Sequence, residues 1–275
     1  MTSLPIRIDD PADPRIAGFV SIKERDLTGR HGLFIAEGTV VLRMLAAAHR
    51  AGQGIRAEAV LLLENRVEGV GSVLSDFPDS VPVYVASAAV FDAIAGFNMH
   101  RGVLALGSRD QALRMEALVA SLPERSLVLA ACGISNHDNM GSMFRNAAAF
   151  GVNAVLMDET SCDPMYRKAI RVSVGSALSV PFAREGSATA LVGRLQAEGF
   201  AIWGLSPRGG TDLHDIPAAP RTALLVGTEG EGLPQHILSS VRTARIRQKP
   251  GLDSLNVATA TGIALHQVAM INGMI

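Results

Sequence analysis

The second half of the chain is built from short apolar runs, and their spacing constrains the fold more than any other feature. After Pro123, segments long enough for a helix separate these runs. Runs that are apolar at every position are typical of strands buried on both faces, as in a parallel sheet covered by helices. The pattern predicts an α/β domain that binds ligands at the carboxyl ends of its strands. The runs are residues 127–131, 154–157, 200–203 and 223–226.

The first half has the pattern of a smaller α/β unit. Residues 33–36 are predicted to form a strand, and apolar residues then recur at helical spacing from Val40 to Ala48. Further strands are expected at residues 59–63 and 81–86. Residues 108–125 contain charged residues, a short amphipathic stretch and Pro123. This composition favours a connection between two domains. We therefore expect a small α/β domain over residues 1–107, a linker over 108–125 and a second domain over 126–275.

Composition excludes several classes of protein. Hydrophobic residues make up 48% and charged residues 19% of the 275, which is typical of a compact α/β protein. No apolar run approaches the ~20 residues that span a bilayer, and the N-terminus lacks the pattern of a secretory signal. We expect a cytoplasmic protein without membrane contact. Cys132 and Cys162 lack metal-like spacing, so we expect inert thiols, no disulfide framework and no metal.

The net charge of −1 argues against broad, nonspecific coating of nucleic acid, which needs clustered lysine and arginine. It leaves room for a local patch. A solvated charged face is the simpler interpretation of each basic cluster, and both interpretations stay open here. The clusters are Lys23, Arg25, Arg30 and His31 near the start, and Arg242, Arg245, Arg247 and Lys249 near the end.

Three blocks of polar residues and glycine follow predicted strands in order. The first contains Asn139 and Arg145 in an Asn-x-Gly-x-x-x-Arg pattern. Asp138 is expected to cap a helix that ends before Gly151. Apolar residues from Met140 to Ala147 fall on one face of that helix, and Arg145 lies outside this stripe. An arginine in such a place is ordinarily solvated or paired.

The second block is Gly-Thr-Glu-Gly-Glu-Gly-Leu from Gly227 to Leu233, directly after a predicted strand. Glycines at a strand exit permit unusual dihedrals and a close approach of backbone to ligand. The turn matches neither a phosphate loop nor a dinucleotide fingerprint, and its two glutamates would repel a pyrophosphate. Alone, it is weak evidence for a site.

The third block is Ser254-Leu255-Asn256-Val257, followed by apolar residues at helical spacing. Ser254 is expected to cap the final helix, and capping alone would account for a serine there. Capping and a functional role are compatible.

Together the blocks resemble the motifs of the SpoU branch of the knotted RNA methyltransferases, over slightly more than half of the chain. The resemblance implies a deep trefoil knot, S-adenosyl-L-methionine as cofactor, and methylation of ribose 2′-hydroxyls in RNA. It implies a catalytic group and a set of cofactor-binding residues. The catalytic group is Asn139, Arg145, Glu229, Ser254 and Asn256, and the cofactor-binding set is Gly227, Thr228, Gly232, Ile246, Gln248 and Leu255.

Residues 30–38 and 100–103 resemble, more loosely, the ribosomal-protein-like substrate domain often fused to these enzymes. The resemblance favours ribosomal RNA as the partner, with transfer RNA as the alternative, and implies a homodimer. The residues expected to contact RNA are Lys23, Arg25, Arg30, Arg167 and Arg171.

Asn139 and Arg145 are suited to hold the reacting oxygen or the adjoining phosphate, because a guanidinium offers a planar fork of donors. Glu229 is expected to pin Arg145 or to accept the proton through water, while Ser254 and Asn256 place the sugar. An arginine pKa above ~12 makes orientation a better role for Arg145 than that of a general base.

The sequence departs from the family pattern at two places. Arg247-Gln248 stands where Pro-Met is usual, and Ala258 replaces a serine. These changes keep open a second hypothesis, a knotted RNA-binding protein of weak activity. A third, a nicotinamide-dependent oxidoreductase, is disfavoured because no early glycine fingerprint is present.

Overall fold

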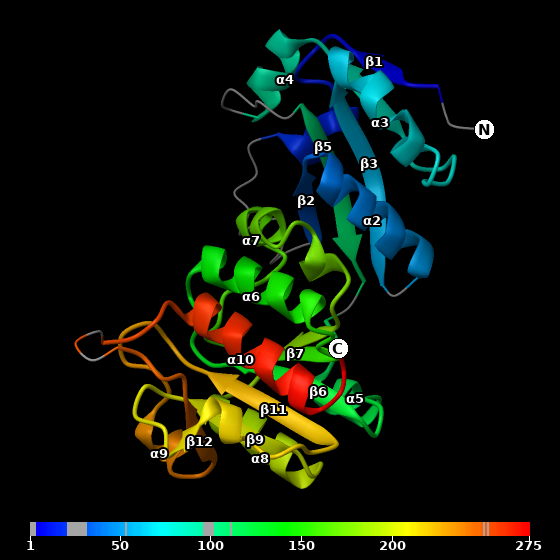
Figure 1. Ribbon diagram of the computed structural model, residues 1–275. Coiled ribbons are helices and arrows are strands. Elements are labelled where there is room, and N and C mark those ends of the chain that lie inside the picture. Colours follow the sequence, from blue (N-terminus) through cyan, green and yellow to red (C-terminus); the bar gives the residue numbers. More distant parts are fainter. Residues whose placement is uncertain are drawn as a thin grey trace. The chain divides into compact units, whose positions relative to one another are not determined.

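The computed structural model describes residues 4–20, 32–52, 54–95, 102–110, 112–249, 251 and 253–275. The chain forms two compact units, which are coloured mainly blue to cyan and green to red in Figure 1. The first unit comprises residues 1–111 and 165–179, and the second comprises residues 112–164 and 180–275.

This division differs from the predicted one in two ways. The stretch expected to be a linker, residues 108–125, begins with the end of a strand and then forms helix α5 (Met115–Ala120). Met115, Leu118 and Val119 are buried in the core of the second unit, because the helix has an apolar face that needs covering. In addition, residues 165–179 belong to the first unit although they lie within the predicted second domain.

The first unit contains a five-stranded mixed sheet of order β1-β4-β3-β5-β2. Strands β1, β4 and β3 pair in parallel, whereas β5 is antiparallel to β3 and β2. The strands are β1 (Ile6–Ile8), β2 (Leu33–Glu37), β3 (Ile55–Leu63), β4 (Val83–Ala86) and β5 (Val103–Arg109). The helices are η1 (Pro14–Phe19), α2 (Thr39–Ala51), η2 (Glu64–Arg66), α3 (Val67–Leu74), α4 (Ala88–Ala95), α7 (Arg167–Val172) and η3 (Ser176–Leu178).

The second unit contains a seven-stranded sheet of order β10-β12-β9-β11-β6-β7-β8, and all of its pairings are parallel, as predicted. The strands are β6 (Ser126–Ala131), β7 (Ala154–Met157), β8 (Phe182–Arg184), β9 (Ala201–Leu205), β10 (Thr211–Asp212), β11 (Arg221–Val226) and β12 (Arg242–Arg245). Besides α5, the helices are α6 (His137–Ala149), α8 (Ala188–Ala197), η4 (Leu213–Asp215), α9 (Gln235–Leu238) and α10 (Val257–Ile271).

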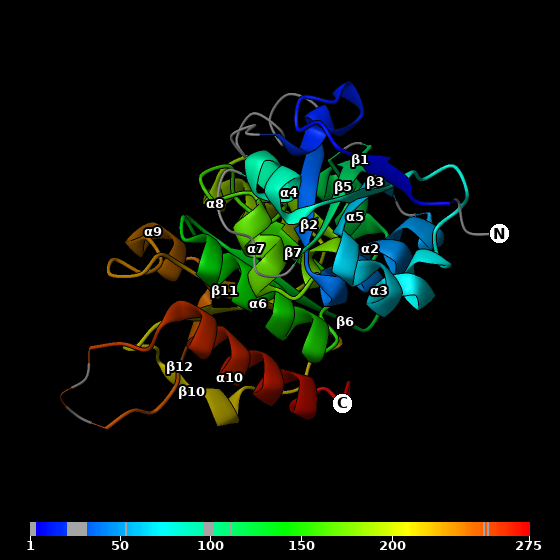
Figure 2. The ribbon, with the colours of Figure 1, turned by 90° about the horizontal axis from the view of Figure 1, so that it is seen from above.

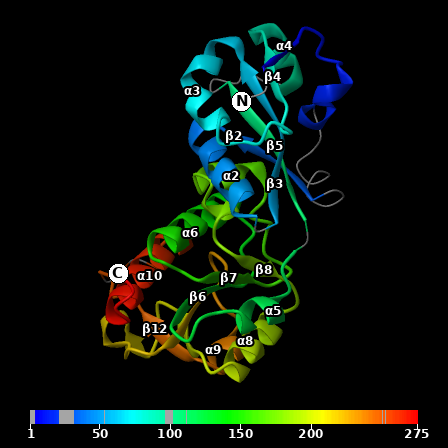
Figure 3. The same cartoon turned by 90° about the vertical axis from the view of Figure 1, so that its right-hand side faces the viewer.

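Helices cover both faces of this sheet, which explains why its strands β6, β7, β9 and β11 are mainly apolar. Alternate residues of β6 and β11 pack with α5, α8 and α9 in one core cluster. On the other face α6 and α10 lie side by side (Figures 1 and 2), and Figure 3 shows the strands between the two helical layers. The four predicted strands of this unit are confirmed, with ends shifted by two residues or fewer.

Two predicted helix caps were wrong. In both helices the residue that caps the N-terminus is an asparagine. The side chain of Asn136, not Asp138, accepts from the first amides of α6. Likewise Asn256, not Ser254, accepts from the amides of Ala258 and Thr259 at the start of α10. Asparagine serves here because its short side-chain oxygen reaches the second and third amides of a helix.

The register aligns the carboxyl ends of neighbouring strands at one edge of the sheet. Val226 of β11 lies opposite Ala131 of β6, and the end of β9 lies beside both β11 and β12. The chain order reverses around β11, so ligands are expected at this edge. No helix in the described part of the chain is both long and apolar enough to cross a membrane.

Candidate active site

A pocket of about 1220 Å³ opens at these strand ends within the second unit. Its walls come from the segments after β9, β11 and β12 and from the start of α10. It gathers every residue that was predicted to bind the cofactor, together with three of the five predicted catalytic residues. These are Gly227, Thr228, Gly232, Ile246, Gln248 and Leu255, and then Glu229, Ser254 and Asn256.

The glycine turn of residues 227–233 forms part of the pocket wall. Thr228 and Gly232 bridge each other, and the Gly232 amide donates to the Thr228 carbonyl over 3.1 Å. At Gly227 an added Cβ would lie 2.3 Å from the carbonyl carbon of Gly232 and 2.4 Å from the Leu233 nitrogen. Only glycine therefore allows the chain to fold back on itself at this strand exit.

A side-chain network joins the three sequence blocks at the rim of the pocket. The Nδ2 amide of Asn256 donates to Oδ1 of Asn139 over 2.9 Å and to Oε1 of Glu229 over 2.7 Å. Asn139 is 7% exposed, so its carbonyl oxygen needs such a donor. The same Asn256 caps α10 through its own Oδ1, and its orientation is therefore fixed at both ends of the amide.

Arg145 has no hydrogen bond or ion pair with the described residues, and its side chain is exposed on α6. The expectation that Glu229 pins Arg145 is not met, because the described partner of Glu229 is Asn256. A guanidinium that has no partner among the described residues is available to a ligand. Ser254 is also exposed on the pocket wall, free of a capping role.

The helices that carry the network are tied together by Asn146, a residue that sequence reasoning missed. It lies two turns beyond Asn139 on α6, and its Nδ2 donates to the Ala258 carbonyl over 2.9 Å. An added Cβ at Gly262 would meet this side chain at 3.0 Å. The asparagine spacing of seven on α6 was a signal for a polar stripe facing α10.

Gln248 offers the pocket a polar atom that has no partner in the described part of the chain. Its Oε1 is buried and accepts no hydrogen bond from the described residues. A buried acceptor of this kind costs free energy unless a ligand donor satisfies it. The lining also carries the carboxylates of Glu229, Glu231 and Asp253, which suit a cationic ligand better than a pyrophosphate.

The predicted RNA-binding residues are only partly described. Lys23, Arg25 and Arg30 lie outside the described residues. Within the first unit, Arg167 and Arg171 of α7 lie 3.8 Å and 3.7 Å from Oε2 of Glu37, a buried carboxylate at the end of β2. Both arginine side chains remain partly exposed.

The second basic cluster is largely used within the protein. Arg245 and Arg247 form ion pairs with Asp212, and Arg242 lies over the ring of Trp203 at 5.6 Å. The three arginine side chains also remain exposed, so the cluster is a charged face open to solvent as well as a set of contacts within the chain. No sequence signal linked the arginines to Asp212, which lies more than thirty residues earlier.

Comparisons with known proteins now identify the class. A family model described as the SpoU rRNA methylase family matches residues 126–266. A protein of Mycobacterium tuberculosis, named as an uncharacterized tRNA/rRNA methyltransferase, is 38% identical over 270 residues, covering 94% of this chain and 89% of that protein. The chain belongs to the SpoU family of RNA methyltransferases.

Solved structures share the fold of the whole chain. An RNA 2′-O ribose methyltransferase is similar with a TM-score of 0.79 and 23% identity, covering 98% of this chain and all of that one. An AdoMet-bound rRNA methyltransferase from Sinorhizobium meliloti is similar with a TM-score of 0.78 and 22% identity, covering 96% and 97%. At these identities the likeness establishes the α/β fold alone.

Proposed function

We propose that the protein transfers the methyl group of S-adenosyl-L-methionine to a ribose 2′-hydroxyl of structured RNA. The observation that carries this proposal is the hydrogen-bonded group Asn139–Asn256–Glu229 at the rim of a pocket lined by all six residues expected to hold the cofactor. The cofactor assignment is further supported by the similar structure that contains AdoMet. The knot implied by the family resemblance is part of the proposal.

The residues of the pocket fit this cofactor chemically. The buried Oε1 of Gln248 is ready to accept from an amino group, and the glycine turn brings backbone amides and carbonyls to the pocket surface. The acidic lining is compatible with a sulfonium cation. When bound, the cofactor supplies an electrophilic methyl group, so the protein's main tasks are alignment and exclusion of water.

Arg145 is the residue we expect to hold the ribose oxygen or the phosphate beside it. It is exposed, unpaired within the described residues, and emerges from the helix that also carries Asn139. A guanidinium stabilises negative charge that develops on the hydroxyl oxygen as its proton leaves. Glu229, which is held by Asn256, is the carboxylate best placed to receive that proton through water.

Asn256 and Asn139 act in this proposal through geometry. Their hydrogen bond couples the start of α10 to α6, so the pocket wall and the helix bearing Arg145 keep a fixed relation. Ser254, exposed on the wall, is suited to contact the sugar. A preorganised group of donors costs little reorganisation when the reaction occurs.

Ribosomal RNA is the favoured substrate, and transfer RNA is the alternative. The name of the M. tuberculosis relative includes both RNA classes, which supports RNA and leaves the choice to experiment. We assign RNA contact in the first unit to Lys23, Arg25, Arg30, Arg167 and Arg171. Their expected targets are loops or bulges, where a nucleotide can be splayed out and its 2′-hydroxyl reached.

A homodimer is also part of the proposal. Ile263 and Met270 are seven residues apart on α10 and are 42% and 54% exposed, so one helical face presents apolar side chains to solvent. The neighbouring Val268 and Ala269 are already buried within the chain. Light scattering coupled to size-exclusion chromatography would give a mass near twice 28.9 kDa if the dimer forms.

The test is transfer of labelled methyl groups from S-adenosyl-L-methionine to purified ribosomal RNA and, separately, to transfer RNA, both lacking ribose methylation. We expect wild-type protein to label ribosomal RNA and Arg145→Ala to lose that labelling. Label in transfer RNA alone would reassign the substrate. Cofactor binding without any transfer would support the RNA-binding hypothesis instead.

A further inference from the structure

We propose that Asp212 is a positioning residue for the cofactor. It clamps residues 245–248 so that Ile246 and Gln248 stay on the pocket wall. This inference rests on the proposed function, because it assumes that the cofactor occupies the pocket.

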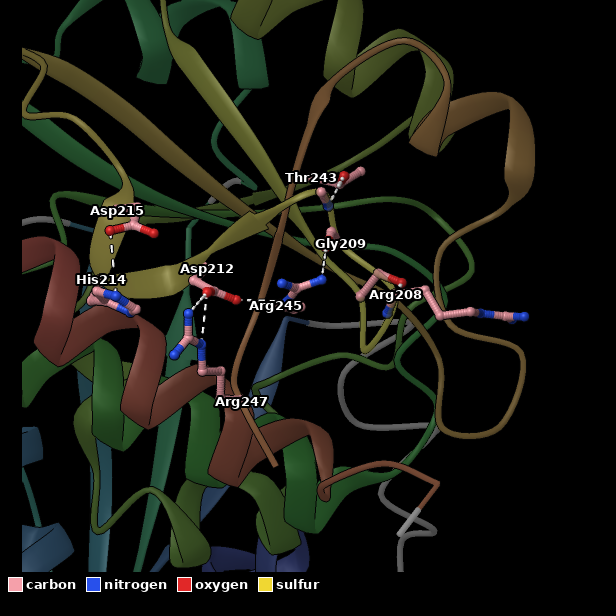
Figure 4. Close-up of polar contacts among 10 residues, drawn as sticks. Arg208, Gly209, Asp212, His214, Asp215, Thr243, Arg245 and Arg247 are labelled. Carbon is pink, nitrogen blue, oxygen red and sulfur yellow. Dashed lines mark hydrogen bonds and ion pairs between the residues drawn. The ribbon is translucent and has the colours of Figure 1, made fainter. Parts of the chain in front are cut away.

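The clamp centres on a buried carboxylate. Asp212 ends the edge strand β10, and its side chain is 6% exposed. Its Oδ1 accepts from Nε of Arg245 over 2.6 Å, and its Oδ2 accepts from Nε of Arg247 over 2.7 Å and from Nη2 of the same residue. Figure 4 shows both guanidinium groups directed at the one carboxylate. Both carboxylate oxygens are therefore engaged.

The backbone register makes this arrangement possible. β10 runs parallel to β12, with Asp212 opposite Arg245. Arg247 lies two residues further along the chain, just beyond β12, and its side chain reaches the same carboxylate as that of Arg245. Ile246, between the two arginines, and Gln248, directly after the second, both line the pocket. The two arginines held by Asp212 thus lie on either side of Ile246 in the sequence, and Arg247 directly precedes Gln248.

Arg245 also holds the loop after β9, which lines another part of the pocket. Nη1 of Arg245 donates to the Gly209 carbonyl over 3.4 Å, and the Gly210 amide donates to Oγ1 of Thr243 over 3.0 Å (Figure 4). An added Cβ at Gly209 would lie 2.4 Å from the backbone of Ala244, which shows how closely this loop lies on β12. The loop continues from Ser206, Pro207 and Arg208, which line the pocket.

The contact with Asp212 restrains a position at which the family's usual proline is absent. Arg247 stands where the family pattern has proline, a residue whose ring restricts the backbone by itself. Arginine leaves the backbone free and must be held through its side chain. The side chain of Arg247 is 72% exposed, yet its guanidinium is tied to a buried carboxylate.

A metal site is the other use that this cluster suggests. Ligand atoms of Asp212, His214 and Asp215 lie within 4.8 Å of one another. The two guanidinium groups on Asp212 already occupy both of its oxygens and would repel a cation. The contacts therefore favour a clamp.

Calorimetric titration with S-adenosyl-L-methionine tests the proposal on the full chain. We expect Asp212→Asn to weaken binding by about tenfold or more, because misplacement of a wall by a fraction of an ångström is costly. Arg247→Ala is expected to weaken binding as well, and Arg247→Lys to restore part of it, since a lysine keeps the charge but loses the fork. The matched control is Asp110→Asn, which removes an exposed ion pair with Arg56 in the first unit.

Two further readouts separate positioning from general damage. Steady-state kinetics of Arg247→Ala should show a raised KM for the cofactor with kcat within about twofold of wild type. Without cofactor, hydrogen exchange at residues 246–249 should be faster in Asp212→Asn than in wild type or Asp110→Asn. If Asp212→Asn does not fold, Arg247→Ala and Arg247→Lys carry the test, because that side chain is mostly exposed.

Equal cofactor affinity in wild type, Asp212→Asn and Arg247→Ala would overturn the inference alone. A wild-type protein that binds no cofactor would overturn the proposed function and this inference together.

Discussion

The side-chain amide of Asn256 donates to the side-chain oxygen of Asn139, which lies 117 positions earlier in the chain. The oxygen of the same Asn256 side chain accepts from two backbone amides and so begins α10. One residue thereby caps a helix and fixes the group at the rim of the pocket. Stability and activity should therefore respond together to its loss.

Asn256→Ala is expected to cost about 1 kcal/mol of stability, as for other N-cap deletions, and to abolish most methyl transfer. Ser187→Ala is the control, since Ser187 caps α8 through the Ala190 amide at a distance from the pocket lining. It should lose similar stability and keep full activity. Ser254→Ala should leave stability unchanged. Thermal unfolding and transfer assays measure both effects, and a stability loss from Ser254→Ala would contradict the cap assignment.

Arg145→Ala is expected to lower kcat by about 10²- to 10³-fold, the typical effect of removing a donor that stabilises developing charge. Because the side chain is exposed and unpaired within the described residues, the melting temperature should stay within experimental error of wild type. Arg145→Lys should recover only a small part of the rate. Full activity of Arg145→Ala would remove this residue from the mechanism.

Gly227→Ala should prevent cofactor binding, because the new Cβ would lie 2.3 Å from the backbone of Gly232 and force the turn open. Gly193→Ala is the matched control, since nothing lies within 4 Å of a Cβ added there. It sits inside α8, where alanine is favoured over glycine by up to about 1 kcal/mol. Calorimetric titration should find unchanged affinity in the control and none in Gly227→Ala.

The Asp212 carboxylate should stabilise the protein over most of the pH range. Hydrogen bonds from Arg247 and then Arg245 lower its pKa to about 2. The folded-state pKa lies below the unfolded value of about 3.9, so this contribution is complete above about pH 5 and roughly half lost by pH 3. The difference in denaturation midpoint between wild type and Asp212→Asn should be constant from pH 5 to 8 and shrink below pH 4. A difference that grows on acidification would contradict the sign.

Both cysteines should be unreactive in the folded protein. Burial, and secondarily the nearby Asp158, raise the pKa of the Cys132 thiol to about 12, and burial raises that of Cys162 to about 11. Because the thiolate is the reactive form, a thiol-specific reagent at pH 8 should label neither residue until denaturant is added. Rapid labelling of the native protein would show that one of them is more accessible than the structure indicates.

Apolar patterning was enough to predict the parallel sheet of the second unit, since β7 matches its predicted run, residues 154–157. Strands without such runs escaped prediction. β12 is Arg-Thr-Ala-Arg and lies towards the edge of the sheet, where burial on both faces is not required. β10 has only two residues and depends on pairing with β12, a long-range contact.

In the candidate site, too, local features could be predicted from the sequence and long-range contacts could not. Residues within local motifs, such as Gly227 and Asn256, could be selected from sequence, because a turn and a helix start have local signatures. Their partners could not be selected. The bond from Asn256 to Glu229, and the pairing of Asp212 with Arg247, depend on how distant segments meet at one sheet edge. Predicting Ser254 as the cap failed because two capping residues compete within three positions.

The most direct measurement of the central claim is the chemical position of the transferred methyl group. RNA labelled by the wild-type protein would be hydrolysed with alkali, which cleaves next to a free 2′-hydroxyl and leaves a 2′-O-methylated linkage intact. Label recovered in alkali-resistant dinucleotides, and absent after reaction with Arg145→Ala, is the predicted result. Label recovered in ordinary mononucleotides would place the methyl group on a base and contradict the account.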